Sequence, residues 1–129
     1  PPAHWDFLMM WLENQTIDIL LLQETHWPYT RDWISDKYMM VHSGSQTQQA
    51  GLLCMVSTKV CHSSELSWYE HLPGRILQLR IHGTSRCIDI LNVYQYTCTP
   101  AHMDSRNQVW HLLFTITQEQ MRPLPIKVE

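Results

Sequence analysis

The sequence predicts an α/β (α+β) domain in which helices cover β-sheets, and three segments carry this prediction. Apolar residues recur at helical spacing over residues 5–12. Residues 17–22 then form a continuous apolar run of the length of a buried strand. Over residues 77–81 every second residue is apolar, the period of a strand with one face in water. A helix that leads into a fully apolar strand favours a helix-covered sheet over an all-β domain.

The remaining elements follow in chain order. Strands are predicted at residues 38–42 and 51–57, at a segment that begins at Gly74, and at residues 87–94. The last two strands are separated by residues 83–86 alone, a connection of hairpin size that indicates antiparallel pairing. Residues 105–108, Ser-Arg-Asn-Gln, fit a capping box that opens a second helix. Residues 28–36 and 61–73 have no clear period and are predicted to be mainly loop.

Composition limits the classes of function. The chain has 129 residues, which is one domain or part of one, and a net charge of −3. This charge argues against a protein that wraps nucleic acid by charge alone, but a nuclease can contact phosphates through a metal ion and a few local cations. The four cysteines form no Cys-x-x-Cys pair, and the histidines lack zinc-ligand spacing. Cys54 and Cys87 lie in apolar segments and are predicted to be buried core residues.

The same features predict an intracellular, reduced protein without a membrane segment. The apolar runs are far too short to span a bilayer, and the first residues do not form a signal-peptide pattern. The chain begins without Met. We therefore expect a fragment of a longer protein.

Two strand ends carry residues suited to chemistry. The run at 17–22 ends in Gln-Glu-Thr-His, so that Glu24 and His26 follow a buried strand. Enzymes built on sheets often place reactive groups at strand ends. The strand at 87–94 likewise ends in Asn92 and Tyr94. The alternative is that Glu24 is a solvated carboxylate, His26 a loop histidine and Tyr94 a half-buried strand-end tyrosine.

The order of these segments resembles a known superfamily. The chain runs from a helix through Ile-Asp-Ile-Leu-Leu-Leu-Gln-Glu-Thr-His and Ala-Gly-Leu-Leu-Cys-Met-Val-Ser to Gly-Arg-Ile-Leu-Gln-Leu-Arg-Ile and Ile-Asp-Ile-Leu-Asn-Val-Tyr. This succession resembles the endonuclease/exonuclease/phosphatase superfamily, and it is most similar to the apurinic-type endonuclease domain of non-LTR (LINE-like) retrotransposons. The resemblance implies a partial four-layer α/β sandwich, with mixed β-sheets packed face to face and flanking helices.

The resemblance also implies roles for individual residues. Glu24 matches the family's metal-binding glutamate and would bind Mg²⁺ or Mn²⁺, since hard cations prefer carboxylate oxygens. Tyr94 matches the family tyrosine that points into the active site and would hydrogen-bond a phosphate oxygen. His26 lies where the retrotransposon branch tends to carry a histidine, which would contact either the phosphate or a residue that binds it. Asn92 belongs to the same strand-end motif and would support substrate binding by holding the residues that contact the substrate.

The activity implied for an intact relative is Mg²⁺-dependent phosphodiester hydrolysis, the nicking of DNA through contacts to its phosphate backbone, in the nucleus. The family's first strand and its Gly-Asp-Phe-Asn and Ser-Asp-His segments do not occur among residues 1–129. We therefore expect a single partial domain and an incomplete or inactive fragment. Two alternatives stay open: a phosphatase- or sphingomyelinase-type phosphoesterase of the same superfamily, and a non-catalytic relic of a mobile element.

Other residues near these motifs have simpler interpretations. Arg75 and Arg106 could approach phosphates, but solvated surface cations are the favoured interpretation. The aromatic residues Trp27, Tyr29 and Trp33 could stack on bases, and we expect them instead to plug the edge of the sheet.

Overall fold

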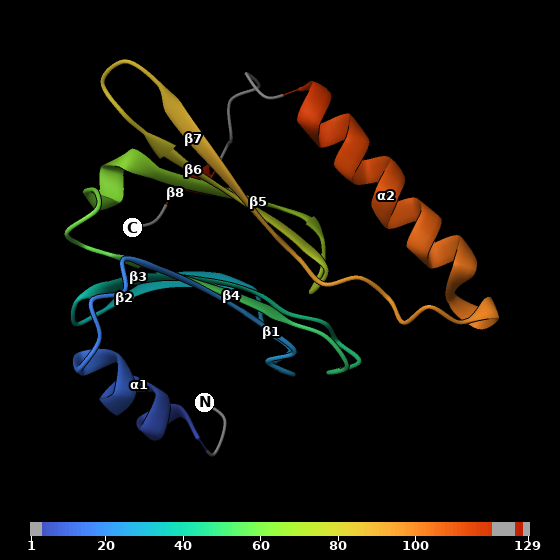
Figure 1. The fold of residues 1–129 in the computed structure, drawn as a ribbon, viewed down its shortest axis with the longest axis horizontal. Coiled ribbons are helices and arrows are strands. Elements are labelled where there is room, and N and C mark those ends of the chain that lie inside the picture. Colours follow the sequence, from blue (N-terminus) through green and yellow to red (C-terminus); the bar gives the residue numbers. More distant parts are fainter. Residues whose placement is uncertain (1–3, 120–125, 128–129) are drawn as a thin grey trace.

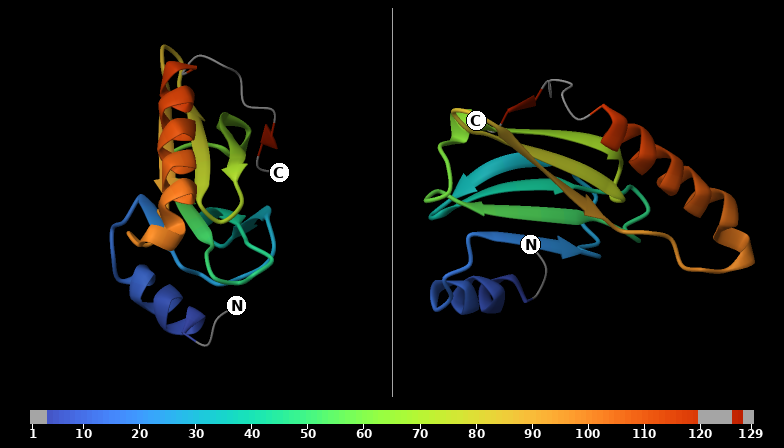
Figure 2. Two further views of the ribbon diagram at one scale, coloured as in Figure 1. Left: turned by 90° about the vertical axis from the view of Figure 1, so that its right-hand side faces the viewer. Right: turned by 45° about the horizontal axis from the view of Figure 1, so that its top comes forward.

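The computed structural model describes residues 4–119 and 126–127, which form four layers (Figure 1). Two β-sheets pack face to face, and helices α1 and α2 lie on opposite outer sides of the pair (Figure 2). The α+β fold class and the layered arrangement predicted from the sequence are confirmed. The elements in chain order are α1 (Trp5–Glu13), β1 (Ile19–Gln23), β2 (Arg31–Ser35), β3 (Tyr38–Ser43), β4 (Leu52–Ser57), η1 (Ser63–Glu65), β5 (Leu66–Leu72), β6 (Ile76–His82), β7 (Cys87–Val93), η2 (Pro100–His102), α2 (Met103–Gln118) and β8 (Ile126–Lys127).

Each sheet has four described strands. The first sheet has the order β1-β4-β3-β2, and the second has the order β7-β6-β5-β8. Every described strand pair is antiparallel, so these sheets are not mixed as the resemblance had implied. The physical reason is the length of the connections, because links such as residues 36–37 and 83–86 allow only hairpins, whereas parallel strands need long crossovers.

Three hydrophobic clusters fill the three spaces between the four layers. The central cluster lies between the sheets and joins Met39, Val41 and Cys54 of the first sheet to Leu77 and Leu79 of the second. A second cluster packs α1, through Leu12, onto the outer face of the first sheet. A third packs α2, through Val109 and Ile116, onto the second sheet. Because β3 and β4 are apolar on both faces and covered on both, all their residues are buried.

Two strands occupy segments that were predicted to be loop. Among the described strands, β2 lies at the edge of its sheet, and its residues are exposed or half-buried, so it lacks the apolar run of a central strand. It joins β3 through the two-residue turn at Asp36, whose φ is 54°. Strand β5 buries Leu66 and Trp68, but a register shift between Glu70 and Leu72 interrupts its alternation. In both cases the partner strand supplies the order that the local pattern does not contain.

Two further sequence predictions are wrong. Helix α2 begins at Met103, and its N-cap, His102, makes no side-chain cap, so Ser105 lies inside the helix rather than in a capping box. Cys87 is exposed on β7, whereas Cys54 is buried as predicted. The difference arises because β7 is an edge strand among the described residues, while β4 is central in the other sheet.

Asn92 joins the two sheets at one end of the sandwich. Its side chain is only 1% exposed, and its amide nitrogen donates hydrogen bonds to the main-chain oxygens of Leu22 and Leu53, each at 3.2 Å. The side-chain nitrogen of Gln23 donates to Val93 O at 2.8 Å and to Asn92 Oδ1 at 3.4 Å. These bonds fasten the end of β1 to the end of β7. A buried amide must be satisfied in this way, because an unpaired buried polar group is strongly destabilising.

Replacing Asn92 by Leu is expected to lower the free energy of unfolding by about 1–3 kcal/mol, because the substitution keeps the volume but removes the donors to two buried carbonyls. Chemical denaturation of the variant and the wild type measures the difference. The control is Asn107→Leu at an exposed position of α2. Equal effects of the two substitutions would contradict the inferred role of Asn92.

Candidate active site

The fold brings Glu24 and Tyr94 together although they lie far apart in the chain. Each is the first residue after its strand, β1 or β7, and the hydrogen bonds of Asn92 and Gln23 hold these two strand ends side by side. The Tyr94 hydroxyl donates a short hydrogen bond to Oε1 of Glu24. Glu24 is exposed and Tyr94 is half-buried, so the pair faces solvent at the rim of the sandwich. We call these two residues the Glu24–Tyr94 pair.

The backbone that presents Glu24 is a strained turn. Glu24 has a φ of 58° and His26 a φ of 64°, both in the left-handed region. Non-glycine residues held in this region are strained by about 1–3 kcal/mol each. Two backbone hydrogen bonds to the residues just before β4 hold this turn. They run from Thr25 N to Gly51 O at 3.3 Å and from His26 N to Ala50 O at 2.9 Å.

Gly51 is required where this turn crosses the chain. Its φ of 130° is unfavourable for any residue with a side chain, and an added Cβ would lie 2.2 Å from Oγ1 of Thr25. The absence of a Cβ therefore lets the turn after β1 approach the residue before β4. This close approach holds Thr25, the residue after Glu24, against the residues that precede β4.

A buried histidine anchors the middle of the turn. His42 on β3 is fully buried, its Nδ1 lies 2.8 Å from Tyr29 O, and its Nε2 lies 2.5 Å from Oγ1 of Thr25. Because a carbonyl can only accept, Nδ1 carries the proton and Nε2 accepts the Thr25 hydroxyl. Burial lowers the pKa of His42, against smaller opposing effects of the Tyr29 carbonyl and the charge of Glu70. His42 is therefore neutral near pH 7.

Arg75 supports the opposite member of the pair. Its guanidinium carbon lies 4.7 Å from the ring centroid of Tyr94 and 3.8 Å from that of Tyr96. Its Nη1 donates to the main-chain oxygens of Tyr94, at 3.3 Å, and Gln95, at 3.2 Å. The backbone closes the arrangement, since Tyr94 N donates to Arg75 O at 2.9 Å. Stacking and hydrogen bonds together fix the Tyr94 ring and place a permanent positive charge beside it.

The electrostatics of the pair keep the phenol protonated. The hydrogen bond to the Glu24 carboxylate is the largest cause that raises the pKa of Tyr94, and burial and the Glu24 charge raise it further. The Arg75 charge acts in the opposite direction. A neutral phenol beside a carboxylate and a guanidinium is a hydrogen-bond donor at neutral pH.

The other sequence-predicted site residues occupy different places. His26 is exposed two residues beyond Glu24 on the same turn, and its ring makes no hydrogen bond to a described residue. Asn92 is buried, and its amide is taken up by main-chain oxygens, so it positions the strand ends from inside. Trp27 is 8% exposed, stacks on Tyr29 at a centroid distance of 5.5 Å and belongs to the hydrophobic cluster between α1 and the first sheet.

Sequence reasoning missed three residues of this region. Arg75 was interpreted as a surface cation, and His42 and Gly51 were not singled out. Arg75 has no local signal in the sequence, because the tyrosines that it contacts lie 19 and 21 residues further along the chain. For His42 a signal exists only in the fold, because its partners lie 13 and 17 residues away.

The Glu24–Tyr94 pair offers one carboxylate to a metal ion. Among the described residues, no three His, Cys, Asp or Glu side chains gather closely enough to hold an ion by themselves. Mg²⁺ does not need such a cage, because it keeps several waters and is often held by one or two carboxylates together with substrate phosphate. The exposed Glu24 carboxylate, with Oε1 bound by Tyr94, fits a single protein ligand to a hydrated Mg²⁺ or Mn²⁺.

Comparison with known proteins adds no relative. The chain matches no protein-family model, no curated protein and no solved structure. In the described part of the chain, neither helix is long and apolar enough to cross a membrane.

The buried state of His42 predicts a loss of stability in acid. Because the pKa of His42 is lowered in the folded chain, the unfolded chain binds the proton first as the pH falls. The stabilisation is complete above the ordinary histidine pKa of about 6.5 and is lost as the pH falls through the folded-state pKa. Urea unfolding at about pH 7.5 and about pH 5 measures this loss, which His42→Gln is expected to reduce. The exposed His111→Gln should leave it unchanged, and equal pH dependence of the His42→Gln and wild-type proteins would refute the prediction.

The hydrogen bond to Glu24 predicts the titration of Tyr94. Glu24→Gln removes the negative charge, so the pKa of Tyr94 is expected to fall towards its ordinary value of about 10. NMR titration of the tyrosine ring carbons, with Tyr94→Phe for assignment, measures the shift. Because the folded-state pKa is raised, the interaction stabilises the chain fully below about pH 10 and the stabilisation is lost as the pH rises through the folded-state pKa. Glu13→Gln on α1 is the matched control, and a shift of equal size in that variant would count against the assignment.

Proposed function

We propose that the Glu24–Tyr94 pair belongs to the active site of a metal-dependent phosphodiesterase that acts on the backbone of DNA, of the kind found in the endonuclease domains of non-LTR retrotransposons. The hydrogen bond between Glu24 and Tyr94, formed across two sheets, is the observation that carries the proposal. The resemblance had assigned one of these residues to the metal ion and the other to the phosphate. Their contact supports a single site in which both groups serve the same substrate.

The proposed division of labour follows from the chemistry of each group. A bound Mg²⁺ would supply positive charge that stabilises the charged oxygens of a phosphodiester under attack. Glu24 would hold this ion through its carboxylate. On substrate binding, the Tyr94 hydroxyl would turn its single O–H from Glu24 to a phosphate oxygen, where negative charge develops, and Oε1 of Glu24 would then be free for the metal ion.

Arg75 extends this proposal to a third residue. Its guanidinium is fixed against the rings of Tyr94 and Tyr96 and by two main-chain oxygens, so that little side-chain freedom remains to be lost on binding. A phosphate beside Tyr94 would lie near this charge. Such a local cation provides attraction to an anionic substrate in a chain whose net charge is −3.

The proposed reaction also needs a group that activates the attacking water, and the family motifs that carry such groups do not occur among residues 1–129. The resemblance assigns activation of the attacking water to an Asp and a His of the Gly-Asp-Phe-Asn and Ser-Asp-His segments. The part proposed for the residues described here is therefore to bind the metal ion and the phosphate. DNA as the substrate would imply action in the nucleus.

Binding of Mn²⁺ tests the proposal without requiring activity. Adding MnCl₂ to the isotope-labelled chain is expected to broaden first the amide signals at Glu24 and Tyr94, since the paramagnetic ion would lie closest to them. Loss of even an outer partner of a metal ligand typically weakens binding about 10- to 100-fold. Glu24→Gln should therefore weaken the broadening by at least about tenfold, while the exposed Glu13→Gln should leave it intact. Broadening that persists in Glu24→Gln would remove Glu24 from the metal site.

The same spectra distinguish the substrate class. With Mg²⁺ present, a short DNA duplex is expected to shift the signals of Arg75 and Tyr94, and Arg75→Gln should reduce these shifts. Inositol phosphate and phosphocholine serve as the comparison ligands. A stronger response to either of these than to DNA would favour the phosphatase or sphingomyelinase branch.

A further inference from the structure

A cysteine, a histidine and a serine lie in a row on the outer face of the second sheet, away from the Glu24–Tyr94 pair. Cys87 begins β7 and pairs directly with His82, the last residue of β6. The Cys87 sulfur lies 3.7 Å from Nδ1 of His82, and Nε2 of His82 lies 2.8 Å from Oγ of Ser67 on β5. We call these residues the Cys87–His82–Ser67 row.

The sheet geometry accounts for the row. Because β5, β6 and β7 are neighbours with antiparallel register, residues on one face of adjacent strands lie side by side. The hairpin that joins His82 to Cys87 is closed by the hydrogen bond from Gly83 N to Arg86 O at 2.9 Å. The thiol and the imidazole are therefore held together by backbone structure.

The protonation pattern suits transfer of the thiol proton. Ser67 is fully buried, so its hydroxyl is a fixed partner for the imidazole. The tautomer of His82 that carries its proton on Nε2 donates to Ser67 and leaves Nδ1 free to accept the proton of Cys87. A nucleophile beside a base, with the base oriented by a third group, is the arrangement that activates thiols in proteins.

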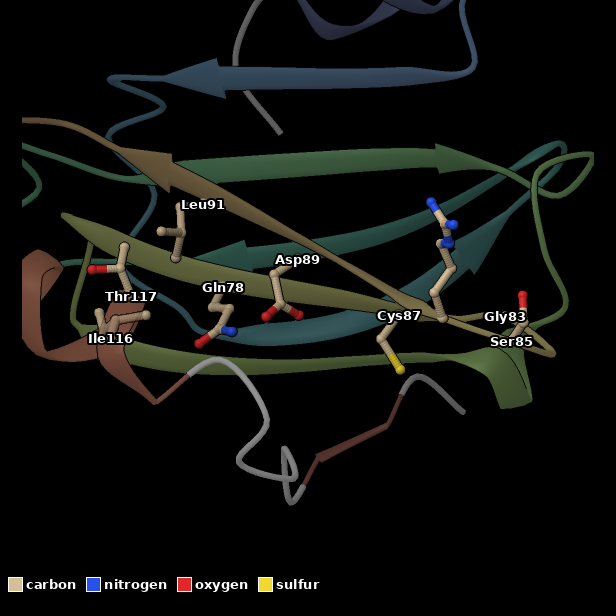
Figure 3. Close-up of a pocket in the computed structure, with 9 residues that line it drawn as sticks. Gln78, Gly83, Ser85, Cys87, Asp89, Leu91, Ile116 and Thr117 are labelled. Carbon is tan, nitrogen blue, oxygen red and sulfur yellow. The ribbon is translucent and has the colours of Figure 1, made fainter.

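The thiol opens onto a cavity of about 660 Å³ between the second sheet and the C-terminal end of α2 (Figure 3). Cys87 and Asp89 lie on the same face of β7, and Ile116 and Thr117 of α2 border the other end of the cavity (Figure 3). A volume of this size accommodates a small molecule. The lining combines charged and polar groups with an apolar end, which suits a small polar thiol compound.

We propose that Cys87 is a nucleophilic thiol that exchanges with low-molecular-weight disulfides and is modified as a mixed disulfide, with His82 as its base. The proton of the thiol passes to Nδ1 of His82, and the Cys87 sulfur attacks one sulfur of the disulfide R–S–S–R. The bond between Cys87 and S–R forms as the S–S bond breaks, and the leaving RS⁻ takes the proton back from the imidazolium. Cys87 is oxidised, and the departing half of the disulfide is reduced to a thiol.

The partner sulfur has to come from outside the chain. All four cysteines are free, and Cys54 and Cys61 pack against the core between the sheets, on the opposite face from Cys87. Cys98 follows the opposite end of β7, close to η2. An external disulfide is therefore the reactant that the geometry favours over an internal bridge.

Cys98 provides the matched comparison, because it is an exposed thiol in the same molecule that has no histidine partner among the described residues. The intact folded chain is incubated with glutathione disulfide, and mass spectrometry of its peptides gives the rate of adduct formation at each cysteine. Cys87 is expected to react at least about tenfold faster than Cys98, since a positioned general base typically contributes more than this. Equal rates at the two cysteines would overturn the proposal.

Two variants test the role of His82. His82→Gln is expected to lower the rate at Cys87 to that at Cys98, whereas His71→Gln, a histidine of the same sheet that binds Gln78, should not change it. Labelling of the buried Cys54 reports any loss of fold in either variant. If His82→Gln does not fold, Ser67→Ala keeps the imidazole but removes its orienting partner, and a several-fold lower rate at Cys87 is expected. A rate at Cys87 that is unchanged in the folded variant would refute the assignment of His82 as the base.

Discussion

The buried amide of Asn92 is the interaction on which the arrangement at the rim of the sandwich depends. Apolar contacts between two sheets have no direction, so they do not by themselves specify which polar groups meet at the ends of the strands. The hydrogen bonds from Asn92 to Leu22 and Leu53 fix one sheet against the other at a defined point. The same point lies two residues from both Glu24 and Tyr94, so that the register of the sandwich and the geometry of the pair have one origin.

At the rim of the sandwich, a rigid pair of sheets carries a turn with a strained backbone. Glu24 leaves β1 through a turn with two left-handed residues, which the close approach of Gly51 and the bond from Thr25 to His42 maintain. Strain of this kind persists only where the surroundings over-determine it, and it is concentrated at functional sites. A solvated strand-end carboxylate would not require a glycine at 51 or a neutral buried histidine at 42. These supports therefore favour a functional interpretation of Glu24 over the alternative of a surface carboxylate.

The outer face of the second sheet changes in character from one end of its strands to the other. Towards the Glu24–Tyr94 pair, Leu91 and Val93 are covered by α2. Towards the hairpin, the face is polar and carries the Arg80–Asp89 ion pair, at 2.6 Å, and the Cys87–His82–Ser67 row. The proposed phosphodiester site and the proposed thiol site thus lie at opposite ends of β7 and can be tested independently.

The sequence by itself determined the layers and the contents of the strand ends. Apolar period and run length identified α1, β1, β3, β4, β6 and β7, because these elements bury enough apolar surface to carry a local pattern. Edge strand β2 and the irregular strand β5 left no such pattern, since hydrogen bonds from their partners stabilise them. Glu24 and Tyr94 could be selected as candidates because a carboxylate and a phenol follow apolar runs.

Only the tertiary structure decided which of these residues meet. The contact of Glu24 with Tyr94 spans 70 residues of chain, and no local period encodes a separation of that length. The contact of His42 with Thr25 is also absent from any local pattern. The contacts of His82 with Cys87 and with Ser67 likewise depend on the register of neighbouring strands. Sequence pattern reports the surface that each segment buries, whereas the packing of one sheet on another sets the distances between their ends.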